Sequence, residues 1–194
     1  MEMNIPGYVN ANYLAEKAAL EPGWTIIGTD PRLGIQRLSF MNHKLTAVEE
    51  ALETYDVDYL AFMKLQALEE IALHRREAEL KGPFGIVLDD RTVGRLTAAE
   101  AGLRLNPDVA TVDWELSRGN FQTMPRAQVI GLCSMAFLHV QQCFQKARQL
   151  SDLVKAVTLP ELEEGQKPGH NLAVALLEIA DLPINEGWPV VPVQ

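Results

Sequence analysis

Nine small or apolar residues recur along one stretch of the sequence at alternating steps of four and three residues. They are Val129, Cys133, Ala136, Val140, Cys143, Ala147, Leu150, Val154 and Val157. This spacing is typical of a heptad seam, the line of side chains along which one helix packs against another. We therefore predict a helix over residues 125–157, roughly 50 Å long at the rise of an α-helix. The seam is expected to pack either within the chain, against a helix in 46–80, or against a partner chain.

A second long helical pattern occupies residues 46–80. Thr46 followed by Glu49 has the spacing of a capping box, in which each side chain bonds a backbone N–H of the first turn. Asp56 and Asp58 interrupt the helix-forming residues, which predicts a kink or a new helix start near Asp56. Apolar residues lie on two lines of this segment, so we expect it to make contacts on two sides, as in a bundle or an oligomer.

Shorter elements are predicted between and around the two long helices. The predicted strands are 24–27 and 35–40, a hairpin joining 86–88 to 92–93, and a hairpin joining 111–116 to 121–124. The predicted short helices are 11–20, a helix entered through a second capping box at Thr97 that ends before Pro107, and 172–182. Because such small segments bury little surface by themselves, we expect residues 1–45 to pack on the long helices or on a partner chain.

The last twelve residues, 183–194, hold three prolines, Trp188 and four aliphatic side chains, a composition that disfavours regular structure. An apolar extended arm is a common device for gripping a neighbouring subunit, whereas a passive tail is usually more polar. Two interpretations stay open, an arm that grips a partner through Trp188 and a tail that packs on its own chain.

Together these patterns predict an α+β fold that is predominantly helical, with two long helices, short β-hairpins and extended terminal segments. Four parts are expected: a docking segment with short strands at 1–45, a long helical segment at 46–81, hairpins and the heptad helix at 82–165, and a short apolar helix with a proline-rich arm at 166–194. The residues predicted to contact a partner are the nine seam residues and Trp188.

The charge balance bears on the class of partner. The 26 Asp and Glu residues outnumber the 17 Lys and Arg residues, which gives a formal net charge of −9 over 194 residues. Non-specific binding to nucleic acid or to an anionic membrane needs a surplus of basic residues, so we expect neither as a partner. No stretch approaches roughly 18 consecutive apolar residues, and the amino terminus has no basic stretch followed by an apolar run. We expect a soluble protein that is not exported, and the seam, which carries no acid, as its contact surface.

No motif indicates a catalytic activity, and we expect a non-enzymatic protein without cofactor or metal. The sequence has no phosphate-binding loop, dinucleotide fingerprint, HExxH, CxxC or GxSxG motif. Its four histidines are scattered over different segments. Cys133 and Cys143 lie about 15 Å apart along one helix, too far for a disulfide within it. Both are interpreted as buried apolar residues.

A set of residues between 46 and 164 carries a family resemblance. It comprises Tyr55-Asp56, Trp114 followed by Gly119-Asn120-Phe121, and His139-Val140, Phe144 and Leu150. In their order along helices and strands they resemble a family of small bacteriophage-encoded proteins whose shared domain has no assigned function. Members of that family resemble tail or tail-fibre-associated proteins, and some resemble fibre-assembly factors.

The resemblance implies a non-enzymatic bacteriophage tail component that binds a tail fibre or baseplate protein, alone or as a homo-oligomer. Such a protein would stay in the virion tail as a structural protein, or act in the host cytoplasm as an assembly factor. Two alternatives belong to other classes. One is a small ligand-binding protein or enzyme whose pocket includes Trp24, Trp114 and His139, and the other is a regulator that binds a host protein through its acidic face.

Overall fold

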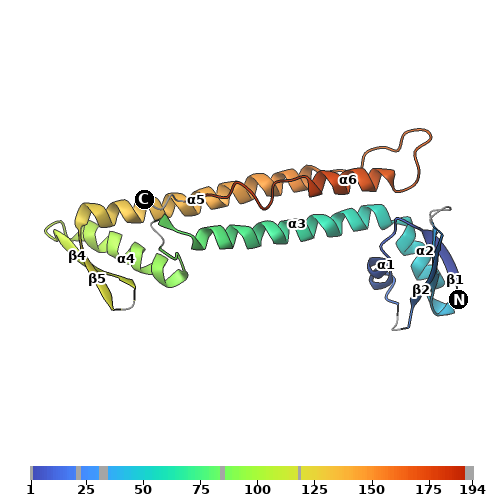
Figure 1. Cartoon of the computed structure of the whole chain (residues 1–194), viewed down its shortest axis with the longest axis horizontal. Coiled ribbons are helices and arrows are strands. Elements are labelled where there is room, and N and C mark those ends of the chain that lie inside the picture. Colours follow the sequence, from blue (N-terminus) through green and yellow to red (C-terminus); the bar gives the residue numbers. More distant parts are fainter. Residues whose placement is uncertain (1, 21–22, 31–34, 84–85, 118, 191–194) are drawn as a thin grey trace. The chain divides into compact units, whose positions relative to one another are not determined.

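The computed structural model describes residues 2–20, 23–30, 35–83, 86–117 and 119–190. The chain divides into two compact units, unit 1 with Met1–Gln66 and Val157–Asp181, and unit 2 with Ala67–Ala156 and Leu182–Gln194. The described residues form six α-helices and two small antiparallel sheets (Figure 1). This confirms the predicted α+β, predominantly helical class.

A three-stranded antiparallel sheet belongs to unit 1. Its strands are β1 (Glu2–Pro6), β2 (Thr25–Asp30) and β3 (Ile35–Ser39), in the order β1-β3-β2. Strands β2 and β3 confirm the two strands expected in this part of the sequence. Strand β1 has no counterpart in the prediction, because it is short and ends in Pro6, a residue that a strand tolerates at the edge of a sheet.

Helix α1 (Ala11–Lys17) confirms the short helix expected near the amino terminus. Asn10 caps it, because its Oδ1 accepts the backbone N–H groups of Asn12 and Tyr13, both at 3.1 Å. Leu14 on the inner side of α1 is fully buried. The cap and this buried leucine together fix where α1 begins and which side faces the core.

The long helical segment predicted to have a kink or a new helix start contains two helices, α2 (Leu45–Glu53) and α3 (Tyr55–Leu80). The break at Thr54 confirms the new helix start expected near Asp56. The hydroxyl of Thr54 donates to the Asp58 carboxylate at 2.8 Å. Acidic side chains in the first turn also interact favourably with the positive end of the helix dipole, so the two aspartates stabilise the start of α3.

The capping box expected at Thr46 is wrong. Helix α2 begins one residue earlier, directly after a 3-10 turn at Asn42–Lys44. Its N-cap residue, Lys44, makes no side-chain cap hydrogen bond. Because the preceding turn already directs the chain into the helix, Thr46 lies inside the first turn and has no capping role.

Helix α4 (Asp90–Leu105) in unit 2 corrects two further predictions. The segment expected to be the second strand of a hairpin is helical, and the capping box at Thr97 is wrong. Asp89 is the N-cap, with its Oδ1 accepting the backbone N–H of Thr92 at 2.7 Å. Thr97 lies inside the helix, and its hydroxyl donates to the carbonyl oxygen of Val93 at 2.9 Å. Asp is as good an N-cap as Thr, and here it starts the helix about two turns earlier.

The rest of unit 2 follows the sequence prediction more closely. Strands β4 (Thr111–Ser117) and β5 (Asn120–Pro125) form the expected hairpin, and Gly119 in its turn has φ +78. Helix α5 (Arg126–Ala156) confirms the long heptad helix. Within unit 2, the part of α3 from Ala67 onward runs beside α5 (Figure 1).

Helix α6 (His170–Ala180) belongs to unit 1 and matches the short apolar helix expected there. The chain after α6 is irregular up to Val190, as expected from its prolines. Residues 191–194, also part of the predicted arm, lie outside the described residues.

Candidate functional site

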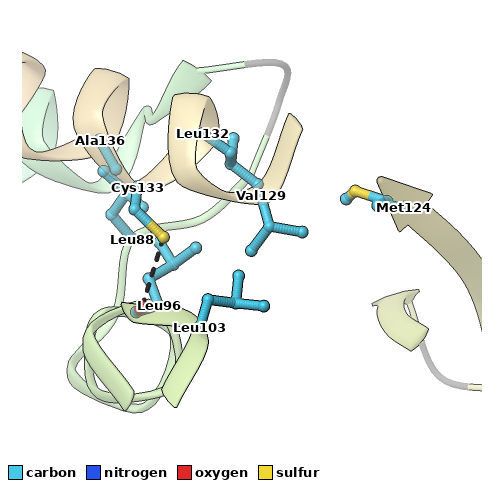
Figure 2. Close-up of a cluster of buried hydrophobic side chains, with 8 residues drawn as sticks. All are labelled: Leu88, Leu96, Leu103, Met124, Val129, Leu132, Cys133 and Ala136. Atoms are coloured by element: carbon cyan, nitrogen blue, oxygen red, sulfur yellow. Dashed lines mark hydrogen bonds between the residues drawn. The ribbon is translucent and has the colours of Figure 1, made fainter. Parts of the chain in front are cut away.

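The seam predicted for partner contact is largely buried within the chain. Its buried members are Val129, Cys133, Ala136, Cys143, Leu150, Val154 and Val157, whereas Val140 and Ala147 are half-buried. Near the start of α5 the seam packs on α4, where it forms a core cluster with Leu88, Leu96 and Leu103 (Figure 2). A partner protein can therefore contact seam residues only where these residues border an opening in the surface.

Trp188, the tenth predicted contact residue, is half-buried in unit 2. Its indole N–H donates to the carbonyl oxygen of Ile184 at 2.7 Å. Its ring stacks on His74, with 6.5 Å between ring centroids. Because both the ring and the N–H have partners inside the unit, this arrangement favours a packed tail over a gripping arm at Trp188.

A groove with a volume of about 580 Å³ opens between α4 and α5 in unit 2. We name it the α4–α5 groove. It is lined by Leu88, Val93, Leu96, Thr97, Glu100 and Arg104 on the α4 side, and by Cys133, Ser134, Ala136, Phe137, Leu138 and Val140 on the α5 side. Four of these residues, Leu88, Leu96, Cys133 and Ala136, also belong to the core cluster drawn in Figure 2. Three of the predicted contact residues, Cys133, Ala136 and Val140, thus border the groove.

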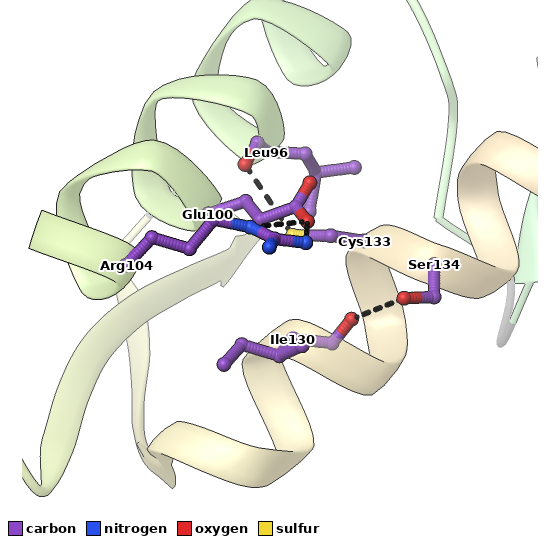
Figure 3. A network of polar contacts seen from close by, with 6 residues as sticks. All are labelled: Leu96, Glu100, Arg104, Ile130, Cys133 and Ser134. Carbon is purple, nitrogen blue, oxygen red and sulfur yellow. Dashed lines mark hydrogen bonds and ion pairs between the residues drawn. The ribbon is translucent and has the colours of Figure 1, made fainter. Parts of the chain in front are cut away.

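Few polar side chains line this groove, and each has a partner; Figure 3 shows those of Glu100, Arg104, Cys133 and Ser134, and the Thr97 hydroxyl donates to the carbonyl oxygen of Val93. Arg104 Nη2 pairs with Glu100 Oε1 at 2.7 Å, across one turn of α4. The Cys133 thiol donates to the carbonyl oxygen of Leu96 at 3.3 Å, and the Ser134 hydroxyl donates to the carbonyl oxygen of Ile130 at 3.0 Å. Burial, with a smaller contribution from Glu100, raises the pKa of the Cys133 thiol. The thiol therefore lacks the thiolate character that a nucleophile needs.

A second groove of about 290 Å³ lies between α3 and α5, also inside unit 2. We name it the α3–α5 groove. It is lined by Leu68, Ile71, Ala72 and Arg75 of α3 and by Phe144, Ala147, Arg148 and Ser151 of α5. The guanidinium carbon of Arg75 lies 4.4 Å from the centroid of the Phe144 ring, within the range of a cation–π contact. Ala147 is the predicted contact residue that borders this groove.

Sequence reasoning from the seam alone does not identify the residues that protrude at these grooves. Phe137 is 63% exposed, Leu138 is 56% exposed and Val93 is 42% exposed. The available signal is the seven-residue spacing of Phe137 and Phe144, which places both phenylalanines beside the seam on one edge of the helix. The exposure of Val93 at the groove is not predicted, because its segment is expected to be a strand.

The residues of the ligand-pocket alternative belong to different units of the chain. Trp24 belongs to unit 1, whereas Trp114 packs against the core cluster of unit 2. His139 is buried, and its Nε2 lies 2.9 Å from the carbonyl oxygen of Ala78. In the part of the chain that the structure describes, no group of three or more His, Cys, Asp or Glu side chains is arranged to hold a metal ion.

Helix α5 has a second property that bears on its surroundings. By length and composition alone it is long and apolar enough to cross a membrane, and 33% of the apolar window is buried inside the structure. Residues 127–145 contain no Asp, Glu, Lys or Arg. The core helix of a soluble protein passes the same test, so the property by itself does not indicate a membrane. It does mean that the exposed part of this stretch is unusually free of charge.

A family model described as a domain of unknown function (DUF4376) matches residues 63–166, more than half of the chain. No curated protein and no solved structure matches the chain. Every residue that lines the two grooves falls within the matched segment.

Proposed function

The chain belongs to the family described as a domain of unknown function (DUF4376), and from its grooves we propose that it is a non-enzymatic protein that docks another protein. The observation that carries this proposal is the α4–α5 groove, whose apolar wall includes the 63% exposed Phe137 and the 56% exposed Leu138. Exposed contiguous apolar surface on a soluble protein marks sites of interaction.

The openness of the groove favours a protein over a small ligand. Binding pockets typically bury about 70–90% of the surface of a drug-sized ligand. A groove with two wall residues, Phe137 and Leu138, that are more than half exposed does not enclose a small molecule to that extent. A partner protein covers such walls with its own side chains, and anchors of this kind, especially aromatic ones, contribute much of the binding energy at interfaces.

The family resemblance of residues 46–164 supports a proposal for the class of partner. We propose a tail fibre or baseplate protein of a bacteriophage, with the chain serving as a structural component of the virion tail or as an assembly factor in the host cytoplasm. The absence of nucleophilic or metal-binding groupings among the groove residues is consistent with a docking role. Partner binding through the grooves leaves the acidic remainder of the surface in contact with solvent.

Co-purification tests this proposal. The full chain is co-expressed with each tail fibre and baseplate protein of the phage that encodes it, and complexes are isolated through a tag on the tail protein. We expect one of these proteins to retain the chain, and Phe137→Ala to weaken retention at least about fivefold. Phe121→Ala is the matched control, because Phe121 is 66% exposed in the same unit but lines neither groove.

Two results would contradict the proposal. Failure of every tail protein to retain the chain would remove the proposed partner class, and equal loss with both phenylalanine variants would remove the groove as the docking surface. Mass spectrometry of purified particles then separates the two roles, because a structural component is present in particles and an assembly factor is absent from them.

A further inference from the structure

The two grooves open along one edge of α5. Phe137 lines the α4–α5 groove and Phe144 lines the α3–α5 groove, and seven residues, or two helical turns, separate them. Two turns amount to about 10 Å along the helix axis. The α5 residues that line the grooves extend from Cys133 to Ser151, about 27 Å of helix. One docking track therefore runs along α5, with an exposed phenylalanine in each of its two parts.

Helices form the walls of this track, apart from Leu88, which precedes α4. A depression between two packed helices accepts a third helix, whose ridges of side chains fill it at an interaxial distance of about 8–10 Å. An amphipathic helix presents apolar anchors at steps of three, four and seven residues, and two anchors seven residues apart match the spacing of Phe137 and Phe144. A helix of about 18 residues is as long as the track.

Arginines predominate among the charged residues of the track. Three arginines and one glutamate line the two grooves: Arg75, Arg104, Arg148 and Glu100. The side chain of Arg148 is 85% exposed and that of Arg104 is 71% exposed. Each arginine pairs with an acid one turn away on its own helix. The more exposed pairs, those of Arg104 and Arg148, contribute only about 0.3–0.5 kcal/mol each. The guanidinium groups of Arg104 and Arg148 are therefore available to a carboxylate of a partner.

Charge argues against a second copy of the chain as the occupant. Helix α5 carries four basic residues, Arg126, Lys146, Arg148 and Lys155, and a single acid, Asp152. Antiparallel pairing of two α5 helices centred between Phe137 and Phe144 brings Lys155 beside Arg126 of the second copy. Parallel pairing brings each basic residue beside its own equivalent. Both arrangements set like charges together, at a cost in affinity.

We propose that the docking element of the partner is an amphipathic helix with acidic residues flanking its apolar anchors, and that it lies along α5 across both grooves. This inference rests on the proposed docking function and specifies the chemistry of the partner. Unit 2 does not repel such a helix, because its 11 Lys and Arg residues nearly balance its 12 Asp and Glu residues. Most of the negative charge of the chain belongs to unit 1, with 6 Lys and Arg residues against 14 Asp and Glu residues.

The test uses two fluorescein-labelled helical peptides of about 18 residues. Both carry leucine at steps of three, four and seven residues, and they differ only in having glutamate or lysine at the flanking positions. Fluorescence anisotropy with the full chain is expected to show at least about tenfold tighter binding of the glutamate peptide, weakening as salt is added. Equal binding, a preference for the lysine peptide, or no binding of either would overturn the inference.

Substitutions along α5 test whether the peptide binds at the two grooves. Arg148→Glu and Phe144→Ala are each expected to weaken binding of the glutamate peptide at least about fivefold. Leu153→Ala is the matched control on α5, since Leu153 is 50% exposed and lines neither groove, and it should leave binding unchanged. A chain dimer that Phe144→Ala abolishes would overturn the inference by assigning the track to a second copy.

Failure of this inference is distinguishable from failure of the proposed function. If a tail protein retains the chain in a manner that depends on Phe137 but is indifferent to Arg148→Glu, docking stands and the acidic helix is excluded. If no tail protein retains the chain while the glutamate peptide binds selectively, the track is an acidic-helix site and the proposed partner class is wrong.

Discussion

The Nε2 atom of His139 lies 2.9 Å from the carbonyl oxygen of Ala78 in the last turn of α3. Because a carbonyl oxygen only accepts, this hydrogen bond assigns the imidazole proton to Nε2. The same carbonyl oxygen also accepts the backbone N–H of Lys81 at 3.1 Å, so His139 is a second donor to it, from α5. With His139 only 2% exposed, the bond is shielded from water and ties α5 to the end of α3.

Replacing His139 should lower the stability of the folded chain. For His139→Ala we expect the free energy of unfolding to fall by about 2–4 kcal/mol, because the substitution leaves a cavity and removes one of the two hydrogen bonds to the Ala78 carbonyl oxygen. Urea denaturation followed by circular dichroism measures the loss. Leu138→Ala is the neighbouring control, since Leu138 is 56% exposed and its truncation should cost less than about 1 kcal/mol. Losses of equal size in the two variants would show that the hydrogen bond to Ala78 contributes little.

The start of α4 gives a second prediction, in which two candidate caps compete. Asp89→Ala removes the side chain that accepts the N–H of Thr92 at 2.7 Å, and should lower the thermal unfolding midpoint by roughly 2–5 °C. Thr97→Ala should leave the midpoint unchanged or raise it slightly, because Thr97 lies inside the helix, where alanine is the better helix former. A larger loss with Thr97→Ala than with Asp89→Ala would show that Thr97, and not Asp89, is the N-cap of α4.

The pH dependence of the same variant follows from the hydrogen bonds of Asp89. Hydrogen bonds from Thr92 hold the pKa of the Asp89 carboxyl below its usual value. A lowered pKa in the folded state means that the contribution of Asp89 is present above the unfolded-state pKa and is lost as the pH falls through the lowered value. The difference in midpoint between Asp89→Ala and the unaltered chain should therefore shrink between pH 5 and pH 2, as measured by thermal melts.

Asp89 and Thr97 also show where sequence reasoning succeeds and where it stops. The heptad period from Val129 to Val157 is a long, strong signal, and the helix it predicts is present as α5. Caps are single residues, and Asp, Ser and Thr compete for the role at several positions of one segment. Packing and the preceding turn decide among them, so the starts at Thr46 and Thr97 are wrong although both spacings are sound.

The candidate site depends on these same local decisions. The period of α5 indicates that Phe137 and Phe144 share an edge, but a groove needs a second wall. That wall is α4, which brings Val93 and Glu100 to the groove only if the helix begins at Asp90. The sequence pattern instead predicts a strand at Val93. The sequence therefore does not predict this wall, and so does not predict the groove. The seam partner was likewise undecided, because a heptad period describes one helix and does not name its neighbour.

The buried thiol of Cys143 should make the free energy of unfolding depend on pH in the alkaline range. Burial raises its pKa to about 11, and Glu79 adds to the shift. A pKa raised in the folded state means that stability is fully present below the unfolded value near 9 and is lost as the pH rises towards 11. The full effect is about 3 kcal/mol, at roughly 1.4 kcal/mol for each pKa unit.

Comparison with Cys143→Ala isolates this contribution from those of lysines and tyrosines that titrate in the same range. We expect the unfolding free energy of the unaltered chain to fall more steeply between pH 9 and pH 11 than that of the variant, in urea denaturation at each pH. The slopes, rather than the absolute values, carry the result, because the variant also loses packing around a fully buried side chain. Parallel slopes would mean that Cys143 meets solvent more readily than its burial indicates.

Substitutions at two glycines of unit 1 distinguish the cost of backbone strain from the cost of a steric clash. Gly165 and Gly169 both have positive φ, +89 and +80. An alanine at either position pays the cost of the left-handed conformation, roughly 1–2 kcal/mol. A Cβ atom at Gly169 would also lie 2.6 Å from Cγ of the Tyr8 ring, whereas a Cβ at Gly165 meets nothing within 4 Å. Gly169→Ala should therefore lower the unfolding free energy by about 1–3 kcal/mol more than Gly165→Ala, in matched urea titrations. Equal losses would mean that Tyr8 moves aside without cost, and that backbone strain alone requires glycine before α6.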